Sequence, residues 1–323
     1  MATYKRQRRQ RYLLMTTDPV HIGTGGYRLG RVDLSIVREP GTKVPKIPGT
    51  SLSGAARAYA ASQYRSLACA GQKDHCGQPS GCPICYTFGS LKETEEGSEK
   101  KTIAYSGVVN LFDAHVLLFP VHSMAGPVWV STPQRLREAG FTVNDVPSDW
   151  RAEQGLFTWS RNDDLNLGWL MLDKGPQIQV TAPNNWDKAD CWQAVKEHIV
   201  LVQEALFSQV VNSNLEVRTS VSIDPERGAA EEGALFTYEA LPRTTFLVTE
   251  VVLDDYRDGQ GSRPFPVTKT KDGDDLPGGR WNDPLDVVKA GLRLAEWLGV
   301  GGMGTRGFGR IAIVGKPNEE EWE

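Results

Sequence analysis

Residues 283–314 read DPLDVVKAGLRLAEWLGVGGMGTRGFGRIAIV, and this stretch carries the clearest fold signal of the chain. The pair Asp283–Pro284 predicts the start of a helix, because aspartate caps the first turn and proline fits its first position. Gly299 predicts where that helix ends. Between the two, apolar side chains recur at helical spacing: Leu285, Val288, Leu292, Ala295 and Leu298. A glycine-rich loop then leads into a last strand at 311–314.

The flanking segments predict the same order of elements twice. A strand at 246–253 (FLVTEVVL) precedes the helix. Near the N-terminus, a strand at 12–17 is followed by a helix over 51–68 and a buried strand at 108–121. Strand, helix, strand in both parts of the chain predicts an α+β fold, a ferredoxin-like sheet with large insertions, organised as one domain over 1–323.

The remaining segments carry weaker signals. Thr50 or Ser51 is the expected cap of the first helix. Extended segments joined by a turn are expected over 215–242, and a long Gly/Pro/Asp-rich loop over 254–282. Residues 141–200 are weakly periodic and rich in Trp and Asn, so the sequence predicts no elements for them.

The composition is that of an ordinary soluble globular protein. The chain has 323 residues, of which 40% are hydrophobic and 24% charged, and this length is sufficient for a large core. No apolar run approaches the roughly 20 residues of a membrane-spanning helix. The basic start, MATYKRQRRQRY, is not followed by the apolar region of a secretory signal. We therefore expect a cytoplasmic protein with no membrane partner.

Charge is divided unevenly along the chain. Residues 1–67 carry twelve Lys and Arg against three Asp and Glu, a balance of +9, so the rest must sum to −13 to give the formal net charge of −4. This asymmetry predicts a basic face that binds a polyanion, on an acidic body. The alternative for the basic run KRQRR at 5–9 is a solvated tail.

The stretch from His21 to Arg57 has the features of an RNA surface. It holds seven glycines, four arginines and two lysines around the carboxylates of Asp33 and Glu39. Glycine lets a backbone approach a ligand closely, and the cations favour an anionic ligand. GMGTRG at 302–307 matches the string of a dinucleotide site, but it follows a helix and precedes a strand, which is the wrong order. We interpret both glycine loops as places where backbone approaches RNA, with plain turns as the alternative.

A cysteine cluster predicts a metal site. Four of the five cysteines fall within 17 residues: Cys69, Cys76, Cys82 and Cys85. In a cytoplasmic chain such clustering favours a metal over disulfides, and four thiolates complete a tetrahedral zinc site. We therefore predict structural Zn²⁺, with His75 as an alternative ligand to Cys76. Cysteines without a metal, or with a redox role, are the other interpretation.

These motifs together resemble a known family, the backbone RAMP subunits of type III CRISPR effectors. The resemblance rests on segments that span nearly the whole chain in order: HIGTGG at 21–26, GRVDLSIVRE at 30–39, PKIPGTSLSGAAR at 45–57, CPICYTFGS at 82–90, FDAHVLLFPVHSMAGPVWVSTPQRL at 112–136, SIDPERGAAEEGALFTYEALP at 222–242 and GVGGMGTRGFGR at 299–310. The fifth of these is most similar to Cmr-type, III-B, subunits. The cysteine-bearing insertion at 69–101, with its charged loop, is similar to zinc-bearing relatives from III-A and III-D systems.

The resemblance implies a modified ferredoxin-like (RRM-like) palm with a β-hairpin thumb at 212–238. It implies that copies of the chain stack along CRISPR guide RNA beside other effector subunits, as part of antiviral defence. It also implies an endonuclease: complementary target RNA is cut at regular intervals in a metal-dependent reaction that uses the Asp of the VD motif, here Asp33. Two alternatives stay open, a backbone subunit that binds RNA without cutting it and a guide-processing endoribonuclease.

The chemistry of aspartate bears on Asp33 independently. An ordinary aspartate, with a pKa of about 3.9, is a poor general base at neutral pH. It is better suited to hold Mg²⁺ or Mn²⁺, which usually takes one or two protein carboxylates. The alternative is a carboxylate paired with Arg31 or Arg38. His21 is the second candidate for a catalytic group.

Guide RNA contacts are expected from the glycine loops and from polar side chains near them. These residues are His21, Gly23, Gly25, Arg31, Arg38, Lys46, Ser51, Ser53, Arg57, Arg218, Gly302, Gly304 and Arg306. The amides at the start of the helix that carries Arg57 are expected to offer an anion site.

Overall fold

The computed structural model describes residues 6–25, 32–71, 75–76, 81–96, 99–230, 235–256, 265, 269–277 and 279–321. Its centre is an 11-stranded sheet. Four strands of this sheet and two helices form the frame, in chain order β1 Gln7–Thr16, α1 Gly49–Gln63, β6 Ala114–Ser123, β18 Phe246–Asp254, α7 Pro284–Leu298 and β19 Ile311–Glu321. The four strands lie in the order β6-β18-β1-β19, and all neighbours are antiparallel. The predicted α+β class is confirmed, and β18 separates β1 from β6 as in a split βαβ arrangement.

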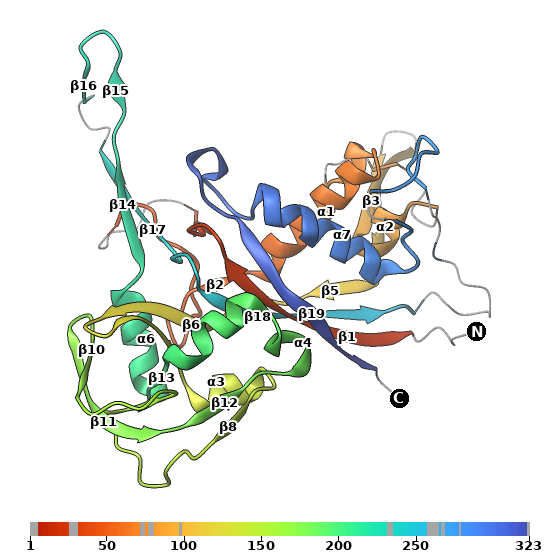
Figure 1. Ribbon diagram of the computed structural model, residues 1–323. Helices are drawn as coiled ribbons and strands as arrows, with labels where there is room; N and C mark the ends of the chain where they lie inside the picture. Colours follow the sequence, from red (N-terminus) through yellow and green to blue (C-terminus); the bar gives the residue numbers. More distant parts are fainter. Residues whose placement is uncertain are drawn as a thin grey trace.

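Alternation of side chains along β1 explains why the sheet is buried on both faces. Tyr12 and Leu14 belong to the core that also contains Leu52 of α1 and Leu292 of α7. Leu13, between them, belongs to a second core. Successive side chains of a strand point to opposite faces, so β1 contributes apolar side chains to both cores. Helices α1 and α7 lie together on one face of the sheet (Figure 1).

Helix α7 begins and packs as its sequence predicts. Asp283 Oδ1 accepts a hydrogen bond from the Leu285 amide at 2.9 Å, and Asp286 Oδ2 accepts from the Asp283 amide at 3.2 Å. This reciprocal capping box satisfies two amides of the first turn. Gly291 lets α7 approach α1 closely, since a Cβ at this position would lie 2.1 Å from the carbonyl oxygen of Ala56.

Helix α1 begins two residues earlier than its serine and threonine predict. Neither Thr50 nor Ser51 caps it, so that prediction was wrong; its N-cap is Pro48, with no side-chain cap. The Gly49 amide instead donates to Asp113 Oδ1 at 2.7 Å. A carboxylate from elsewhere in the chain therefore takes the place of a local cap, and it suits the positive end of the helix dipole.

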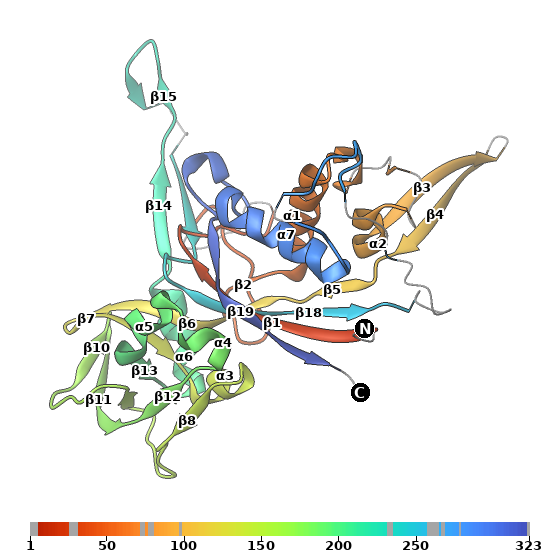
Figure 2. The ribbon, with the colours of Figure 1, turned by 45° about the vertical axis from the view of Figure 1, so that its right-hand side comes forward.

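Two hairpins project from the sheet on the side of α1 and α7 (Figure 2). The first, which we call the thumb hairpin, overlaps the expected range 212–238 but extends to residue 240, and it is built from β14 Glu216–Ser220, β15 Ile223–Asp224, β16 Ala229–Ala230 and β17 Phe236–Ala240. The second pairs β3 Gly89–Glu96 with β4 Glu99–Ser106, where we expected a charged loop. Thr102, Ile103 and Tyr105 favour an extended backbone there.

The middle of the chain widens the sheet and covers its second face. Its elements are β7 Gly126–Ser131, α3 Pro133–Glu138, β8 Thr142–Asn144, β9 Gln154–Phe157, β10 Leu165–Leu167, β11 Leu170–Gln177, β12 Gln179–Thr181, α4 Asn184–Asp187, α5 Asp190–Val195, β13 Ile199–Leu201 and α6 Glu204–Ser213. Trp186 and Trp192 are almost completely buried there, against Phe141. These short strands explain why no periodicity was visible in the sequence.

The remaining elements are short. They are β2 Lys46–Ile47, α2 Pro83–Phe88, β5 Val109–Leu111 and the 3-10 turns Leu67–Cys69, Lys196–His198 and Gly304–Arg306. The buried strand predicted over 108–121 is thus two strands, β5 and β6, with a break that contains Asp113. The described residues of the expected loop 254–282 form no helix or strand beyond the end of β18. No described helix is both long enough and apolar enough to cross a membrane.

Candidate nucleic-acid interface and metal centre

Asp33 is fastened to the base of the thumb hairpin. Its Oδ2 accepts two hydrogen bonds from Thr237 of β17, one from the amide at 2.7 Å and one from the hydroxyl at 2.9 Å. The Asp33 amide lies 3.1 Å from the same hydroxyl oxygen. These hydrogen bonds, first the one from the Thr237 amide, lower the pKa of Asp33 below its ordinary value. Asp33 is therefore ionised at neutral pH and suited to hold a cation rather than to take a proton.

The arginine expected beside Asp33 has a different partner. Arg38 forms a two-pronged ion pair with Glu239 of β17, with distances of 2.6 Å from Nη1 to Oε1 and 2.8 Å from Nη2 to Oε2. Its Nε donates to Asn212 Oδ1 at 2.9 Å. The guanidinium is thus committed to contacts within the protein, which argues against Arg38 as a phosphate contact. Arg31, the other proposed partner of Asp33, lies outside the described residues.

Replacing Arg38 by alanine is expected to destabilise the chain and leave Asp33 in place. The Arg38 side chain is 23% exposed and that of Glu239 9%, so the variant leaves an uncompensated carboxylate in a nearly buried site. We expect a loss of about 3 kcal/mol, at the low end of what breaking a buried ion pair costs. Urea unfolding of the wild type, Arg38→Ala and the exposed control Arg151→Ala measures it. An unchanged free energy of unfolding for Arg38→Ala would contradict this assignment.

His21 holds the two glycine loops together. Its ring is 5% exposed, and Nδ1 donates to the Glu239 carbonyl oxygen, 2.7 Å away. Its own carbonyl oxygen accepts from the Gly302 amide at 2.9 Å. Gly301 has to be glycine, because a Cβ there would lie 2.6 Å from the His21 carbonyl oxygen. Such burial and anchoring favour a structural role for His21 over a surface RNA contact, while Gly23 and Gly302 are exposed.

An open groove runs between the start of α1 and the second glycine loop. Its volume is about 370 Å³, and it is lined by Thr50, Ser51, Gly54, Ala55, Tyr59, Leu298, Gly299, Val300, Gly301, Gly304 and Phe308. Two of the expected RNA contacts, Ser51 and Gly304, thus lie in one groove. Gly25 is exposed and Ser53 is half-buried, and neither lines it. Backbone amides and hydroxyls in an open groove suit a phosphate backbone.

Two arginines stack on aromatic rings where the thumb hairpin meets this groove. The Arg306 guanidinium lies 5.1 Å from the ring centre of Phe236, and that of Arg218 lies 4.8 Å from the ring centre of Phe308. Tyr238 packs against both rings. Both arginines are exposed. Arg218 Nε also donates to Glu216 Oε1 at 2.6 Å, whereas stacking on Phe236 orients the Arg306 guanidinium and leaves its N–H groups able to meet a phosphate or a base.

Lys46 is tied to two carboxylates and does not face the groove. Its Nζ lies 2.5 Å from Asp113 Oδ2 and 2.9 Å from Glu39 Oε1. Asp113, and then Glu39, raise the pKa of Lys46. Glu39, Asp113 and His115 are near enough to one another to form a cation site, and the Lys46 ammonium already neutralises it. This geometry argues against Lys46 as a guide contact.

The basic start of the chain is neutralised within the sheet. Among the described residues, five ion pairs link β1 to acidic residues: Arg8 to Asp283 at 2.9 Å and to Glu319 at 3.4 Å, Arg9 to Glu250 at 3.6 Å and to Glu320, and Arg11 to Glu250 at 2.9 Å. The described part of this basic run, from residue 6 onward, is thus neither a solvated tail nor a free polyanion surface. A positive charge count along the sequence did not reveal these partners, because they lie far away in the chain.

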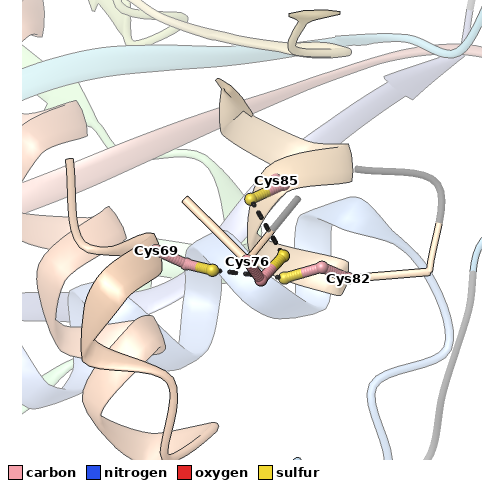
Figure 3. Close-up of side chains that lie close together, drawn as sticks. All are labelled: Cys69, Cys76, Cys82 and Cys85. Carbon is pink, nitrogen blue, oxygen red and sulfur yellow. Dashed lines mark hydrogen bonds between the residues drawn. The ribbon is translucent and has the colours of Figure 1, made fainter. Parts of the chain in front are cut away.

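The four clustered cysteines meet at one point (Figure 3). All four Sγ atoms lie within 4.8 Å of one another, with 3.7 Å between Cys69 and Cys82 and 3.8 Å between Cys76 and Cys85. Tetrahedral zinc, with Zn–S bonds of about 2.3 Å, requires sulfur atoms about 3.8 Å apart. The donor set and its spacing therefore fit a metal. Cys76 occupies its place in the cluster, so His75 is not needed as a ligand.

The thiols of this cluster perturb one another. Hydrogen bonds from Cys82 and Cys85 lower the pKa of Cys69, whereas the same neighbourhood raises the pKa of Cys85. Without a cation, one thiolate is stabilised at the expense of the others. A divalent metal would remove this conflict, because it allows all four groups to be deprotonated together.

Arg57 packs against the cysteine segment. Its Nε donates to the Cys69 carbonyl oxygen at 2.8 Å and its Nη2 to the Gly89 carbonyl oxygen at 2.9 Å. The same Nη2 lies 2.9 Å from His75 Nδ1. All three contacts lie in the cysteine-bearing insertion, so this geometry argues against Arg57 as an RNA contact. The Asp113 carboxylate at the start of α1 likewise disfavours the anion site expected there.

Comparison with known proteins decides the family. The sequence profile of the RAMP superfamily matches residues 13–312. The chain belongs to the RAMP superfamily. It is similar to the CRISPR system Cmr endoribonuclease Cmr4 of Pyrococcus furiosus, with 25% identity over 256 residues that cover 74% of this chain and 80% of the relative.

Solved structures share the fold of this RAMP chain. One is a chain of the type III-B Cmr-beta complex bound to cognate target RNA, with a TM-score of 0.60, 14% identity and 96% of each chain covered. Another is oligomeric Cmr4 from Pyrococcus furiosus, with a TM-score of 0.51, 15% identity and coverage of 98% of this chain and 99% of that one. The match to the RAMP profile confirms the predicted family, and the solved structures confirm its fold.

Sequence reasoning missed several residues that organise the candidate site of this RAMP chain. Thr237 and Glu239 alternate along β17 with Phe236 and Tyr238. The polar pair holds Asp33 and Arg38, while Phe236 lies under Arg306 and Tyr238 packs against Phe236 and Phe308. The period-two alternation in FTYE was visible as a strand signal. Nothing in the sequence indicated which distant residues it would meet.

Proposed function

We propose that this RAMP chain is a backbone subunit of a Cmr-type, III-B, CRISPR effector that works in the cytoplasm. Copies of the chain polymerise along guide RNA, together with other effector subunits. The assembly cuts complementary target RNA at regular intervals. The chain is thus an endoribonuclease whose site is complete only when guide and target are both in place. Similarity to Cmr4, itself named an endoribonuclease, supports this proposal.

The observation that carries the proposal is the attachment of Asp33 to Thr237. It puts an ionised carboxylate at the root of a projecting hairpin, against β17, the strand that also carries Phe236, the ring beneath Arg306. A hairpin that intrudes into a duplex presents a distorted phosphodiester at its root. A fixed carboxylate there is suited to in-line cleavage, which depends on positioning and on neutralising charge.

Guide and target take different surfaces in this proposal. The guide backbone follows the groove between α1 and the second glycine loop, which Ser51 and the exposed Gly304 line, and Arg306 follows Gly304 in the same loop. The target strand passes Asp33. His21 stabilises both surfaces, because its ring binds the Glu239 carbonyl oxygen of the hairpin and its own carbonyl oxygen binds the Gly302 amide of the loop.

Two kinds of metal belong to the proposal. Asp33 would hold Mg²⁺ or Mn²⁺, and the ion would neutralise charge on the scissile phosphate. The thiolates of Cys69, Cys76, Cys82 and Cys85 hold a structural Zn²⁺, with no position open for catalysis. The cysteine-bearing insertion at 69–101 is similar to zinc-bearing III-A and III-D relatives, whereas the rest of the chain is similar to Cmr-type subunits. The chain thus combines features of more than one type III subgroup.

Removing the loop arginine Arg306 tests the guide surface. In the Arg306→Ala variant we expect weaker binding of a short single-stranded RNA with little dependence on its sequence, because a phosphate contact is lost. The slope of log affinity against log salt should become shallower by about 0.7, the value for one contact on a single strand. Arg151→Ala, in an exposed position on the middle segment, is the matched control. Equal slopes for Arg306→Ala and the wild type would remove Arg306 from the guide surface.

The two alternative functions predict different behaviour. A purely binding backbone protects target RNA without cutting it in Mg²⁺ or Mn²⁺. A guide-processing enzyme cuts precursor RNA as a lone protein, without a stacked assembly. The ionised carboxylate at the root of the hairpin favours target cleavage over both.

A further inference from the structure

We propose that Arg57 is a positioning residue of the zinc site and that it couples metal occupancy to helix α1. This inference rests on the proposed binding of zinc by the four cysteines. Arg57, which the sequence predicted as a guide RNA contact, would thus contact the metal centre instead.

Arg57 joins the two ends of the metal-binding segment. Its side chain extends from the middle of α1 and meets the carbonyl oxygen of Cys69, the first ligand in the sequence, and that of Gly89, just after α2. It also meets His75, the residue before the second ligand. A single guanidinium thus connects both ends and the middle of the segment that has to close around the ion. The rigid guanidinium fork has five donors and is suited to binding several of these groups at once, whereas a lysine would supply only a single point of charge.

Charge gives the second reason. Zinc with four thiolates carries a net charge of −2, and Cys69, Cys82 and Cys85 are buried. A buried anionic centre is costly unless a cation lies near it. The Arg57 guanidinium is half-buried, and its hydrogen bond to the Cys69 carbonyl oxygen holds its positive charge beside this cluster. Outer residues of this kind typically contribute 10- to 100-fold to metal affinity, as an order of magnitude.

The same arrangement connects the metal to the groove. Thr50, Ser51 and Gly54 line the groove and lie one to two turns before Arg57 on α1. A helix transmits a shift along its length because its hydrogen-bonded turns move together. The metal-filled cluster therefore fixes Arg57, and Arg57 fixes the helix whose first turns face the guide. Loss of zinc is expected to weaken RNA binding without any ligand residue touching RNA.

The first test measures zinc affinity of the full chain by competition with a chromophoric chelator. We expect Arg57→Gln to bind zinc roughly 10- to 100-fold more weakly than the wild type. Arg57→Lys should fall between the two, because it restores the charge without the fork. Arg65→Gln is the matched control, since Arg65 follows the same helix and contacts Asp272 and Asp274, away from the cysteines. Wild-type zinc affinity in Arg57→Gln, or in Arg57→Lys if the glutamine variant does not fold, overturns the inference.

The second test separates this role from a direct RNA contact. RNA affinity of the wild type and of Arg57→Gln is measured with zinc in excess and again after zinc is removed with a chelator. We expect zinc removal to weaken RNA binding by the wild type and to weaken binding by Arg57→Gln no further, because the coupling passes through Arg57. Wild-type binding that zinc removal leaves unchanged, together with a deficit in Arg57→Gln, would mean that Arg57 binds RNA itself. A wild-type chain that binds no zinc would overturn the metal proposal as well. If the wild type binds zinc and the Arg57 variants bind it equally well, only this inference is overturned.

Discussion

Target RNA cleavage by complexes assembled with Asp33→Asn is expected to fall by about 10²- to 10⁴-fold, the range for loss of a positioned catalytic group. Asparagine keeps an oxygen that can accept the two hydrogen bonds from Thr237, so the hairpin root retains its geometry. It removes the negative charge that the metal needs. Because hydrogen bonding lowers the pKa of Asp33, the wild-type carboxylate is ionised throughout the neutral range, and a shift of pH there should not imitate the variant.

A second variant at the same contact is the control. Thr237→Val removes the hydroxyl donor but leaves the amide that also binds Asp33, so cleavage should fall far less than in Asp33→Asn. For both variants, guide binding is measured by filter binding and complex size by native mass spectrometry. Cleavage by Asp33→Asn at the wild-type rate, in a complex of normal size, would show that the carboxylate is only a structural partner of Thr237.

Loss of one cysteine ligand is expected to have the largest effect on stability. Cys85→Ser takes a soft ligand from a fully buried position in the cluster. Structural zinc supplies about 10–16 kcal/mol of apparent binding energy in zinc-finger peptides, and we expect a loss of at least about 3 kcal/mol in this larger chain. Each kcal/mol lowers Tm by about 2–4 °C in a large domain, so the melting point should fall by about 6 °C or more.

Cys191→Ser serves as the control for this prediction. Cys191 is half-buried in the middle segment, away from the cluster, and its pKa is raised by burial. Its replacement should leave the zinc content at one ion per chain. Calorimetry and metal analysis are run on both variants and on wild type treated with a chelator. Equal melting points for Cys85→Ser and the wild type, or no effect of the chelator, would argue for cysteines without a metal.

The parts of the structure that were predictable depend on neighbours in the sequence. Asp283 and Asp286 cap the helix in which they lie, so the start of α7 was readable from a few residues. The cysteine cluster was predictable for a related reason, since its ligands come from one short segment. The prediction that Thr50 caps α1 was wrong because Asp113, 64 residues away from Gly49, accepts the amide hydrogen bond at the start of the helix instead.

The unpredictable parts depend on long-range contacts. Arg38 and Glu239 are 201 residues apart in the chain, and the sequence offered no means of pairing them. Lys46 was expected on RNA because its partner Asp113 lies 67 residues away. For both cations, a count of local charge predicted a free positive surface. The fold neutralises them by bringing distant acidic residues alongside.

The most direct test of the whole account is a cleavage assay on the assembled complex with guide and end-labelled complementary RNA, resolved to single nucleotides. We expect evenly spaced cuts within the paired region in Mg²⁺ or Mn²⁺, cutting weaker by about 10²- to 10⁴-fold with Asp33→Asn, and no cuts with a chelator. Intact, protected target in both metals, or cutting of guide precursor by the chain alone, would contradict it.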